Sequence, residues 1–449
     1  KKWNSALKSA SKVKDREFRN LIDWMYLKTT RNGASFSEYK NFIEQNSEYP
    51  RINRIRFLAE GKIYLRNNSP TSIINWFDKY PPLGGMGKIK LAEAYLEKGQ
   101  TEKVQELIKE GWETATISKN DLGYYRAKFK KFIDSEDHIR RADYLAWEKK
   151  YWDLKRMLKY LPKDQRALYN ARQILMSNSY GVDNAISKVP EYLKKDPGLE
   201  FDRLRWRNRR GRLEGSLEIL YRNSIKTEQQ MVRPDKWWEQ RESVVRSLIY
   251  KKRYKTAYKI SSEHALSAGP SFAEAEWLSG WIALTFLNSP EYAINHFQNF
   301  YNNVGYPISL ARGAYWLGAS YEKLNEKQLS NDFYSQAAEF PMTYYGQLAF
   351  NKINPGGNFE LKDESFFDKD YEKEFKKNKL IRHIILLKEL NATQLGKDIF
   401  KHLAGLNIEK GSEVLAAELA TSVERYDFAI QISKKASYEK RFYNRFNYP

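Results

Sequence analysis

The chain has 449 residues and no cysteine, which excludes disulfide bonds, thiolate catalysis and cysteine-ligated metals. Its 77 lysines and arginines outnumber its 56 aspartates and glutamates, and the resulting formal charge of +21 points to an anionic polymer as a partner. With only 23 glycines and 14 prolines the chain has little turn chemistry for a protein of many strands, whereas 41% hydrophobic residues are enough for a packed core.

Uninterrupted apolar runs are short, and "WIALTF" at 281–286 is among the longest of them. A membrane-spanning helix needs about 18 or more consecutive apolar residues, so no membrane span is expected. The chain starts with "KKWNSALKSA", without an initiator methionine or an apolar segment. Any targeting peptide is therefore expected to have been removed or to lie outside this sequence.

Four stretches repeat apolar residues at spacings of three and four, which is the pattern of one helix face. Each stretch is interrupted in its middle, so each predicts two helices joined by a turn. The stretches are 88–112, 243–266, 276–301 and 316–340. In the last of them Asn325 and Glu326 interrupt the pattern, and Pro341 ends it because proline cannot continue a helix.

Small residues stand among large aromatic ones in the stretch 316–340. Gly318 and Ala337 have almost no side chain, so the two backbones are expected to approach closely, with Tyr321 and Tyr334 filling the space beside them. The repeat is looser than the tetratricopeptide period of about 34 residues. These patterns predict an all-α protein: a superhelical solenoid of tetratricopeptide-like helical hairpins, curved into a ring, whose concave surface is the expected place for binding.

Changes in composition divide the chain into three parts. Residues 1–350 are expected to form the superhelical domain. Residues 351–379 are polar, contain Pro355 and show no sustained apolar stripe, so they predict a linker. Helical patterns return in residues 380–449, which predict a small helical linker domain.

The expected superhelical domain needs a cap, because its last hairpin would otherwise expose an apolar face. The segment "TYYGQLAF" at 343–350 is the predicted cap. In it Tyr344, Tyr345, Leu348 and Phe350 would supply apolar area, while Gly346 would allow close approach.

Basic residues concentrate in "RLRWRNRRGR" at 203–212. On a helix Arg203, Arg207 and Arg210 share a face, which could attract the carboxylates or phosphates of an anionic polymer. The alternative interpretation is a solvated face that nearby aspartates and glutamates partly neutralise.

Three features that can mark ligand sites are interpreted as structural. The turn "LGGMGKIK" at 83–90 lacks the glycine that a phosphate loop needs five positions before Gly-Lys, because Pro82 stands there. The histidines lack the i, i+4 spacing of a zinc-binding helix, so no metal and no cofactor are expected; they are His138, His264, His296, His383 and His402. Several tryptophans are expected in the core, although one on a concave face could stack on a sugar ring; they are Trp237, Trp238, Trp277, Trp281 and Trp316.

Three motifs resemble the soluble lytic murein transglycosylases of the bacterial periplasm: "FAEAEWLSGWIAL" (272–284), "ISLARGAYWLGASYE" (308–322) and "TYYGQLAF" (343–350). The stretches 201–220 and 235–249 also resemble the helical region of that family. The resemblance implies a large ring-shaped helical domain, a small helical linker domain and a lysozyme-like catalytic domain. It further implies a periplasmic protein that cleaves between N-acetylmuramic acid and N-acetylglucosamine to form a 1,6-anhydro sugar.

The catalytic motif of that family, Glu-Ser-x-Phe followed by Gly-Leu-Met-Gln, does not occur in its proper setting here. The segment "ESFF" at 364–367 matches the first part, with Glu364 in the place of the catalytic acid. It follows a polar stretch, whereas a glycosidic acid needs an apolar pocket that raises its pKa. We therefore interpret Glu364 as a linker residue and assign no catalytic residue to this chain.

The resemblance thus predicts the non-catalytic helical portion of a lytic transglycosylase. It would bind or orient peptidoglycan glycan strands for a C-terminal catalytic domain in cis, and it would be inactive alone. Arg203, Arg207 and Arg210 are the predicted substrate-binding residues, and no nucleic acid is expected as a partner. The alternative hypothesis is a stand-alone helical-repeat scaffold that binds proteins or RNA.

Overall fold

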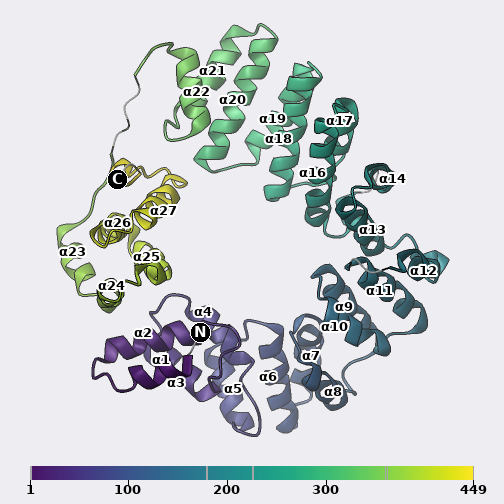
Figure 1. Cartoon of the computed structure of the whole chain (residues 1–449), viewed down its shortest axis with the longest axis vertical. Coiled ribbons are helices and arrows are strands. Elements are labelled where there is room, and N and C mark those ends of the chain that lie inside the picture. The colour runs from purple at the N-terminus through teal and green to yellow at the C-terminus, as the bar shows by residue number, and fades with distance from the viewer. Residues whose placement is uncertain (1–2, 178–179, 225–226, 359–360, 362, 448–449) are drawn as a thin grey trace. The chain divides into compact units, whose positions relative to one another are not determined.

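The computed structural model describes residues 3–177, 180–224, 227–358, 361 and 363–447. Within these ranges every regular element is a helix, and most helices follow one another as antiparallel hairpins (Figure 1). This confirms the prediction of an all-α protein. Contacts group the chain into two compact units. Unit 1 comprises Lys1–Gln173 and Ser365–Ile432, and unit 2 comprises Ile174–Glu364 and Ser433–Asn447.

The helices of unit 1 come from both ends of the chain. They are α1 (Trp3–Ala10), α2 (Arg16–Leu27), α3 (Phe36–Gln45), α4 (Ile52–Glu60), α5 (Pro70–Lys79), α6 (Gly85–Glu97), α7 (Glu102–Thr114), α8 (Lys119–Lys128), α9 (Ser135–Trp147), α10 (Tyr151–Met157), α23 (Lys369–Lys376), α24 (Lys379–Glu389), α25 (Lys397–Ala404) and α26 (Ser412–Ser422). Short 3₁₀ helices are Leu158–Tyr160, Thr393–Gly396 and Ile408–Lys410. The helices α11 (Lys163–Leu175) and α27 (Tyr426–Ser437) begin in one unit and end in the other.

The helices of unit 2 come mainly from the middle of the chain. They are α12 (Val182–Ser187), α13 (Pro197–Arg209), α14 (Leu213–Asn223), α15 (Glu228–Met231), α16 (Pro234–Tyr250), α17 (Tyr254–Ser262), α18 (Gly269–Phe286), α19 (Pro290–Asn302), α20 (Pro307–Lys323), α21 (Lys327–Ala338) and α22 (Tyr344–Ile353). Short 3₁₀ helices are Glu191–Leu193 and Asn444–Phe446. All four helical hairpins expected from the sequence are present, as α6–α7, α16–α17, α18–α19 and α20–α21.

Within unit 1 the C-terminal helices pack against the N-terminal ones. The hydroxyl of Tyr49 and Nε2 of His383 are 2.9 Å apart, and both side chains are buried. Lys28 donates to the carboxylate of Asp398 at 3.1 Å. The expected domain boundaries at 350 and 380 stay a prediction. They are drawn where the sequence pattern changes, whereas units 1 and 2 are defined by contacts between residues.

Part of the stretch expected as a linker is helical. The helix α23 buries Tyr371 and Phe375, an i, i+4 apolar pair, in unit 1. One such pair is too short a pattern to predict a helix among charged residues, since most of its stability comes from the packing of that face.

Buried arginines connect neighbouring helices in both units. Arg141 in α9 donates to the carbonyl oxygens of Trp112 and Ala115 at the end of α7, and Arg241 in α16 donates to Ile260 near the end of α17 at 2.9 Å. The last carbonyls of a helix have no partner within it and carry partial negative charge, so a cation is well placed there. Burial lowers the pKa of both guanidinium groups to about 10, which leaves them charged at neutral pH.

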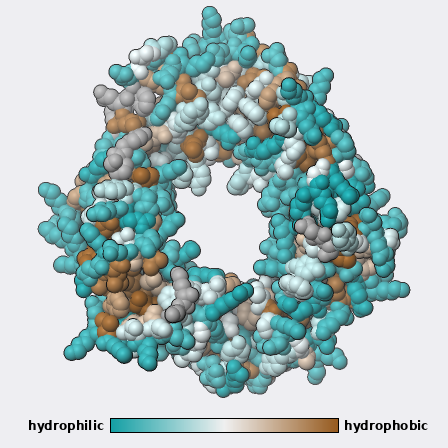
Figure 2. Space-filling model, viewed as in Figure 1, coloured by the Kyte–Doolittle hydropathy of each residue, from teal (hydrophilic) through white to brown (hydrophobic). Residues whose placement is uncertain are grey.

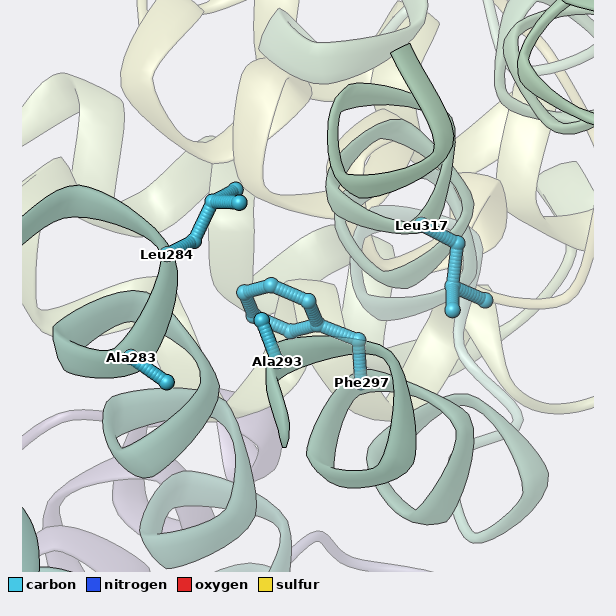
Figure 3. Packing of buried hydrophobic residues seen from close by; sticks show 5 residues of the cluster. All are labelled: Ala283, Leu284, Ala293, Phe297 and Leu317. Carbon is cyan, nitrogen blue, oxygen red and sulfur yellow. The ribbon is translucent and has the colours of Figure 1, made fainter. Parts of the chain in front are cut away.

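The α18–α19 and α20–α21 hairpins share one packing device. A Cβ built on Gly280 would lie 2.8 Å from the Phe297 ring, and one built on Gly318 would lie 2.8 Å from the Tyr334 ring. Each glycine on the first helix therefore receives an aromatic ring from the second. Figure 3 shows the Phe297 ring between the helix that carries Ala283 and Leu284 and the helix that carries Leu317.

This arrangement refines the packing expected for the stretch 316–340. The small side chain of Gly318 makes room for the Tyr334 ring, and Tyr321 stacks on Phe333 at 5.5 Å between ring centroids. The helix α22 packs on α20 and α21, which agrees with its expected role as a cap. Tyr344, however, is 69% exposed and does not supply the apolar area expected of it.

The visible face of the molecule is mostly hydrophilic, with small apolar patches between polar residues (Figure 2). Among the described residues, no helix combines the length and the apolar composition that crossing a bilayer would take.

Candidate functional site

A cleft of about 650 Å³ opens in unit 2 where α18, α20, α21 and α22 meet. Its size lies within the range of about 300–1,000 Å³ that is common for ligand pockets. The residues that line it combine aromatic rings with charged and amide groups. They are Leu284, Thr285, Asn288, Tyr315, Trp316, Ala319, Glu322, Lys323, Tyr334 and Lys352.

Two consecutive aromatic residues of α20 form one wall of this cleft. The ring of Trp316 stacks on Phe297 at 5.7 Å and meets the edge of Trp277 at 6.2 Å. The ring of Tyr315 lies 5.2 Å from Tyr345 of α22. Because both rings are only partly buried and are held by aromatic neighbours, they offer a preorganised apolar surface.

A short polar network lines the same cleft. Lys352 of α22 donates to both carboxylate oxygens of Glu322 at 3.0 Å, and the Tyr334 hydroxyl donates to Oε2 at 2.7 Å. Burial opposes the ionisation of Glu322, but the bonds from Tyr334 and Lys352 outweigh it and lower the pKa of this carboxyl. Burial, followed by the bond to Glu322, raises the pKa of Tyr334.

The cleft is suited to binding rather than to acid–base cleavage. A general acid in a glycosidase needs a raised pKa, and a second carboxylate usually faces it. Glu322 is an ionised partner of Lys352, its pKa is lowered, and it is the one carboxylate among the lining residues. The groups available to a ligand are the pair of rings, the partly exposed Glu322–Lys352 pair and the side chains of Thr285, Asn288 and Lys323.

The three arginines predicted to bind substrate lie on and just after α13. Arg207 donates to the carbonyl oxygen of Gly215 and to Glu218 at 3.0 Å, so it joins α13 to α14. Burial, followed by the positive charges of Arg207 and Arg222, lowers the pKa of Arg203. These two arginines therefore share a local network with Glu218.

Arg210 lies at the other end of the predicted basic face. It follows the last helical residue of α13, is exposed, and lies over the ring of Trp206 at 4.8 Å. Arg212 lies over the same ring at the same distance. The binding role of the three arginines stays a prediction, and Arg210 is the most accessible of them.

Glu364, the residue that matches the family's catalytic acid in sequence, lies in an exposed loop of unit 2. Its backbone N–H donates to the Phe442 carbonyl at 2.8 Å, and its carboxylate accepts from the Phe442 N–H at 3.1 Å. These bonds attach the loop to the segment around Phe442, and the described residues form no apolar pocket around the carboxyl. This environment agrees with a structural role.

The glycine-rich turn before α6 holds one of the chain's own carboxylates. Glu60 of α4 accepts hydrogen bonds from the N–H groups of Leu83 and Gly84, and a Cβ built on Gly87 would lie 2.5 Å from its carboxyl carbon. Burial raises the pKa of Glu60 to about 7, against the effect of these N–H groups. The helix N-terminus that could receive a phosphate is thus occupied by Glu60.

The structure brings together two histidines that are far apart in the sequence. Glu276 of α18 accepts hydrogen bonds from His264 Nε2 at 2.9 Å, from His296 Nδ1 at 2.8 Å and from Asn299 at 3.2 Å. Burial opposes its ionisation, but the two histidine bonds outweigh it and lower the pKa of Glu276 to about 2. The Leu266 N–H donates to Nδ1 of His264, which leaves Nε2 as the protonated nitrogen of that ring.

This cluster is a buried structural network, since its atoms already satisfy one another. In the described ranges no group of three or more histidine, cysteine, aspartate or glutamate side chains could hold a metal ion. Trp237 and Trp238 are buried in the core, as expected, whereas Trp316 also lines the cleft.

The sequence analysis expects Trp316 in the core, with stacking on a sugar ring as the alternative, and it does not identify Glu322 or Lys352. Glu322 and Lys352 carry no local signal, because a Glu and a Lys on different helices are ordinary surface residues until the hairpins stack. The repeat pattern could have located the cleft, because the cleft lies where the last two hairpins and the predicted cap meet.

Comparisons with known proteins identify the fold. No protein-family model and no curated protein matches this sequence. The X-ray structure of an inactive mutant of the lytic transglycosylase Slt from Pseudomonas aeruginosa is similar to the chain, with a TM-score of 0.64 and 15% identity over 98% of this chain and 72% of that one. The 70-kDa soluble lytic transglycosylase from Escherichia coli gives a TM-score of 0.57 and 13% identity over 100% of this chain and 72% of that one.

A complex of the 70-kDa soluble lytic transglycosylase with bulgecin A gives a TM-score of 0.56 and 13% identity, over 96% of this chain and 67% of that one. At these identities the likeness concerns the fold. It confirms that the chain has the helical fold of the soluble lytic transglycosylases, as the sequence motifs implied.

Proposed function

We propose that this chain is the helical portion of a peptidoglycan lytic transglycosylase and that it binds and orients glycan strands. The observation that carries the proposal is the cleft of unit 2, which Tyr315 and Trp316 line together with the Glu322–Lys352 pair, in a chain with the fold of lytic transglycosylases. Cleavage belongs to a separate lysozyme-like domain acting in cis, and the place of action is the periplasm.

The chemistry of the cleft fits one repeating unit of such a strand. A pyranose ring presents C–H groups on its faces, which pack on aromatic rings, while its hydroxyl and acetamido groups need hydrogen-bond partners at the edge. Tyr315 and Trp316 supply the first kind of contact. Glu322, Lys352 and Asn288 supply the second.

The basic charge of the chain adds a less specific attraction. Peptide stems on a glycan strand carry carboxylates, and a net charge of +21 raises their local concentration near the protein. Arg210 is the exposed member of the predicted basic face, whereas Arg207 is engaged with Glu218 and the Gly215 carbonyl.

The aromatic wall is tested by sedimentation with insoluble peptidoglycan. Tyr315→Leu keeps apolar volume against Tyr345 but removes the flat ring, so the apparent Kd for sacculi should rise roughly twofold to tenfold, the equivalent of ~0.5–1.5 kcal/mol. The matched control is Tyr250→Leu at the end of α16, where the side chain is 89% exposed. Equal sedimentation of wild type and Tyr315→Leu would remove the cleft from the proposal.

The charge contribution is tested by salt. Raising NaCl from about 0.1 M to about 1 M shortens the Debye length from about 10 Å to about 3 Å, so retention on sacculi should fall. Arg210→Gln should weaken retention at low salt and show a smaller salt effect, whereas Arg31→Gln, at an exposed site in unit 1, should resemble wild type. Retention that ignores both salt and Arg210 contradicts the basic-face prediction, and preferential retention of RNA over sacculi would favour the scaffold hypothesis.

A further inference from the structure

A second cavity, of about 230 Å³, lies in unit 1 between α1, α2 and α3. It is smaller than the pockets of about 300–1,000 Å³ that hold drug-sized ligands, so it suits a head group or a short side chain. Most of its lining side chains are polar, and among the described residues none of them is cationic. They are Leu7, Asn20, Asp23, Tyr26, Leu27, Glu38, Asn41, Phe42, Gln45 and Asn46.

The charge of this cavity is opposite to that of the chain. Its two ionisable carboxyl groups, Asp23 and Glu38, occur in a protein with 77 basic residues, yet no lysine or arginine of the described ranges lines it. Glu38 is engaged in the cap of α3, where it accepts from the Ser35 N–H at 2.8 Å. The nearby guanidinium of Arg19 donates to the Val13 carbonyl at 2.9 Å.

Asp23 is therefore the carboxylate with free capacity. In the part of the chain that the structure describes, it has no hydrogen bond or ion pair of its own. Burial, followed by the charge of Glu38, raises its pKa, and Arg19 offsets this only in part. Such a group gains most from an incoming cation.

A buried amide adds an acceptor to the same cavity. Asn46 is 4% exposed, and its Nδ2 donates to the Phe42 carbonyl at 3.1 Å. Among the described residues, Oδ1 of this side chain accepts no hydrogen bond. An amide oxygen of a buried residue and an unpaired carboxylate that line the same cavity both call for a hydrogen-bond donor.

We propose that this cavity binds a primary ammonium group carried on a small polar body. The ammonium has three N–H donors, which match the carboxylate of Asp23 and the Oδ1 of Asn46, while Leu27 and Phe42 cover the attached carbons. Two carboxylates exclude an anion. The amide-rich lining offers too few charged oxygens for a divalent cation, and in the described ranges no metal-binding group of acidic or histidine residues occurs here. The site is separate from the cleft, so it does not depend on the function proposed above.

An ammonium group of this size has two natural sources, a lysine-type amino-acid side chain and an amino sugar. The full chain is titrated by calorimetry with Nα-acetyl-lysine methylamide and with glucosamine. The same compounds acetylated on the amine serve as neutral probes. Saturable binding of at least one amine and loss of binding on its acetylation are the expected results, and the tighter amine identifies the source.

Variants place the binding in this cavity. Asp23→Asn preserves shape and should weaken amine binding at least about tenfold, whereas Asp78→Asn, on the exposed face of α5, should leave it unchanged. Asn41→Asp adds a carboxylate at the cavity rim and should strengthen binding, which a merely misfolded protein would not do. Amine binding that survives in Asp23→Asn, or that the acetylated probes match, overturns the proposal. Sedimentation with sacculi through the unit 2 cleft should be the same for Asp23→Asn and wild type, so the two proposals fail independently.

Discussion

Replacing Glu276 with glutamine is expected to destabilise unit 2 by about 2–4 kcal/mol, since it breaks a buried charged network. The carboxylate of Glu276, a side chain only 5% exposed, accepts from His264, His296 and Asn299. A glutamine has one acceptor oxygen, and its NH₂ group would face a histidine N–H, so at least one buried donor loses its partner. Denaturant unfolding monitored by tryptophan fluorescence measures the loss, with Glu291→Gln on the exposed side of α19 as the matched control.

The same residue predicts a difference in acid stability. The pKa of Glu276 is lowered from 4.5 to about 2, so its contribution is fully present above pH 4.5 and is lost as the pH falls towards 2. One unit of pKa is worth about 1.4 kcal/mol, which makes the full contribution roughly 3 kcal/mol. Wild type should therefore lose stability more steeply than Glu276→Gln across this window, and the two unfolding curves should converge near pH 2. Parallel profiles would show that the network carries no net charge stabilisation.

The hairpins were predictable because the signal for them is local. Apolar residues at spacings of three and four mark each helix, and Asn325 with its positive φ of 62° marks a turn of the kind that sequence patterns reveal. The role of glycine in helix packing could be predicted from the sequence, but its exact contacts could not. The sequence predicts that Tyr321 and Tyr334 fill the space beside Gly318. The structure places the Tyr334 ring directly against Gly318, whereas Tyr321 stacks on Phe333.

The candidate sites were less predictable, since they are assembled across helices. His264, Glu276 and His296 lie on different elements, and their spacing in the sequence does not predict that they form a network. The same holds for Glu322 and Lys352. Conversely, Arg207 has the charge expected of a binding residue, but the structure uses it to join α13 and α14. The net charge of a sequence indicates the sign of the charge on a binding partner. The structure shows which charged side chains are already engaged within the protein.

Replacing Gly346 with alanine is expected to detach the cap helix α22 from the last hairpin of unit 2. A Cβ at this position would lie 2.0 Å from the carbonyl oxygen and 2.7 Å from the carbonyl carbon of Phe340. Both atoms are backbone, so no side chain can rotate away and α22 itself must move. Overpacking of a flexible core typically costs about 1–3 kcal/mol, and a backbone clash of this size should cost at least about 3 kcal/mol.

The detachment would also be visible in binding, because α22 supplies Tyr345 against Tyr315 and Lys352 against Glu322. Gly346→Ala should thus lower the midpoint of thermal unfolding, increase binding of a hydrophobic dye through exposure of Ala337 and Ala349, and reduce sedimentation with sacculi. Gly305→Ala, where a Cβ meets nothing within 4 Å, is the matched control. If Gly346→Ala melts and binds like Gly305→Ala, α22 neither caps the array nor holds the cleft in shape. If it melts early yet keeps wild-type retention on sacculi, the cap is confirmed and the binding surface lies outside the cleft.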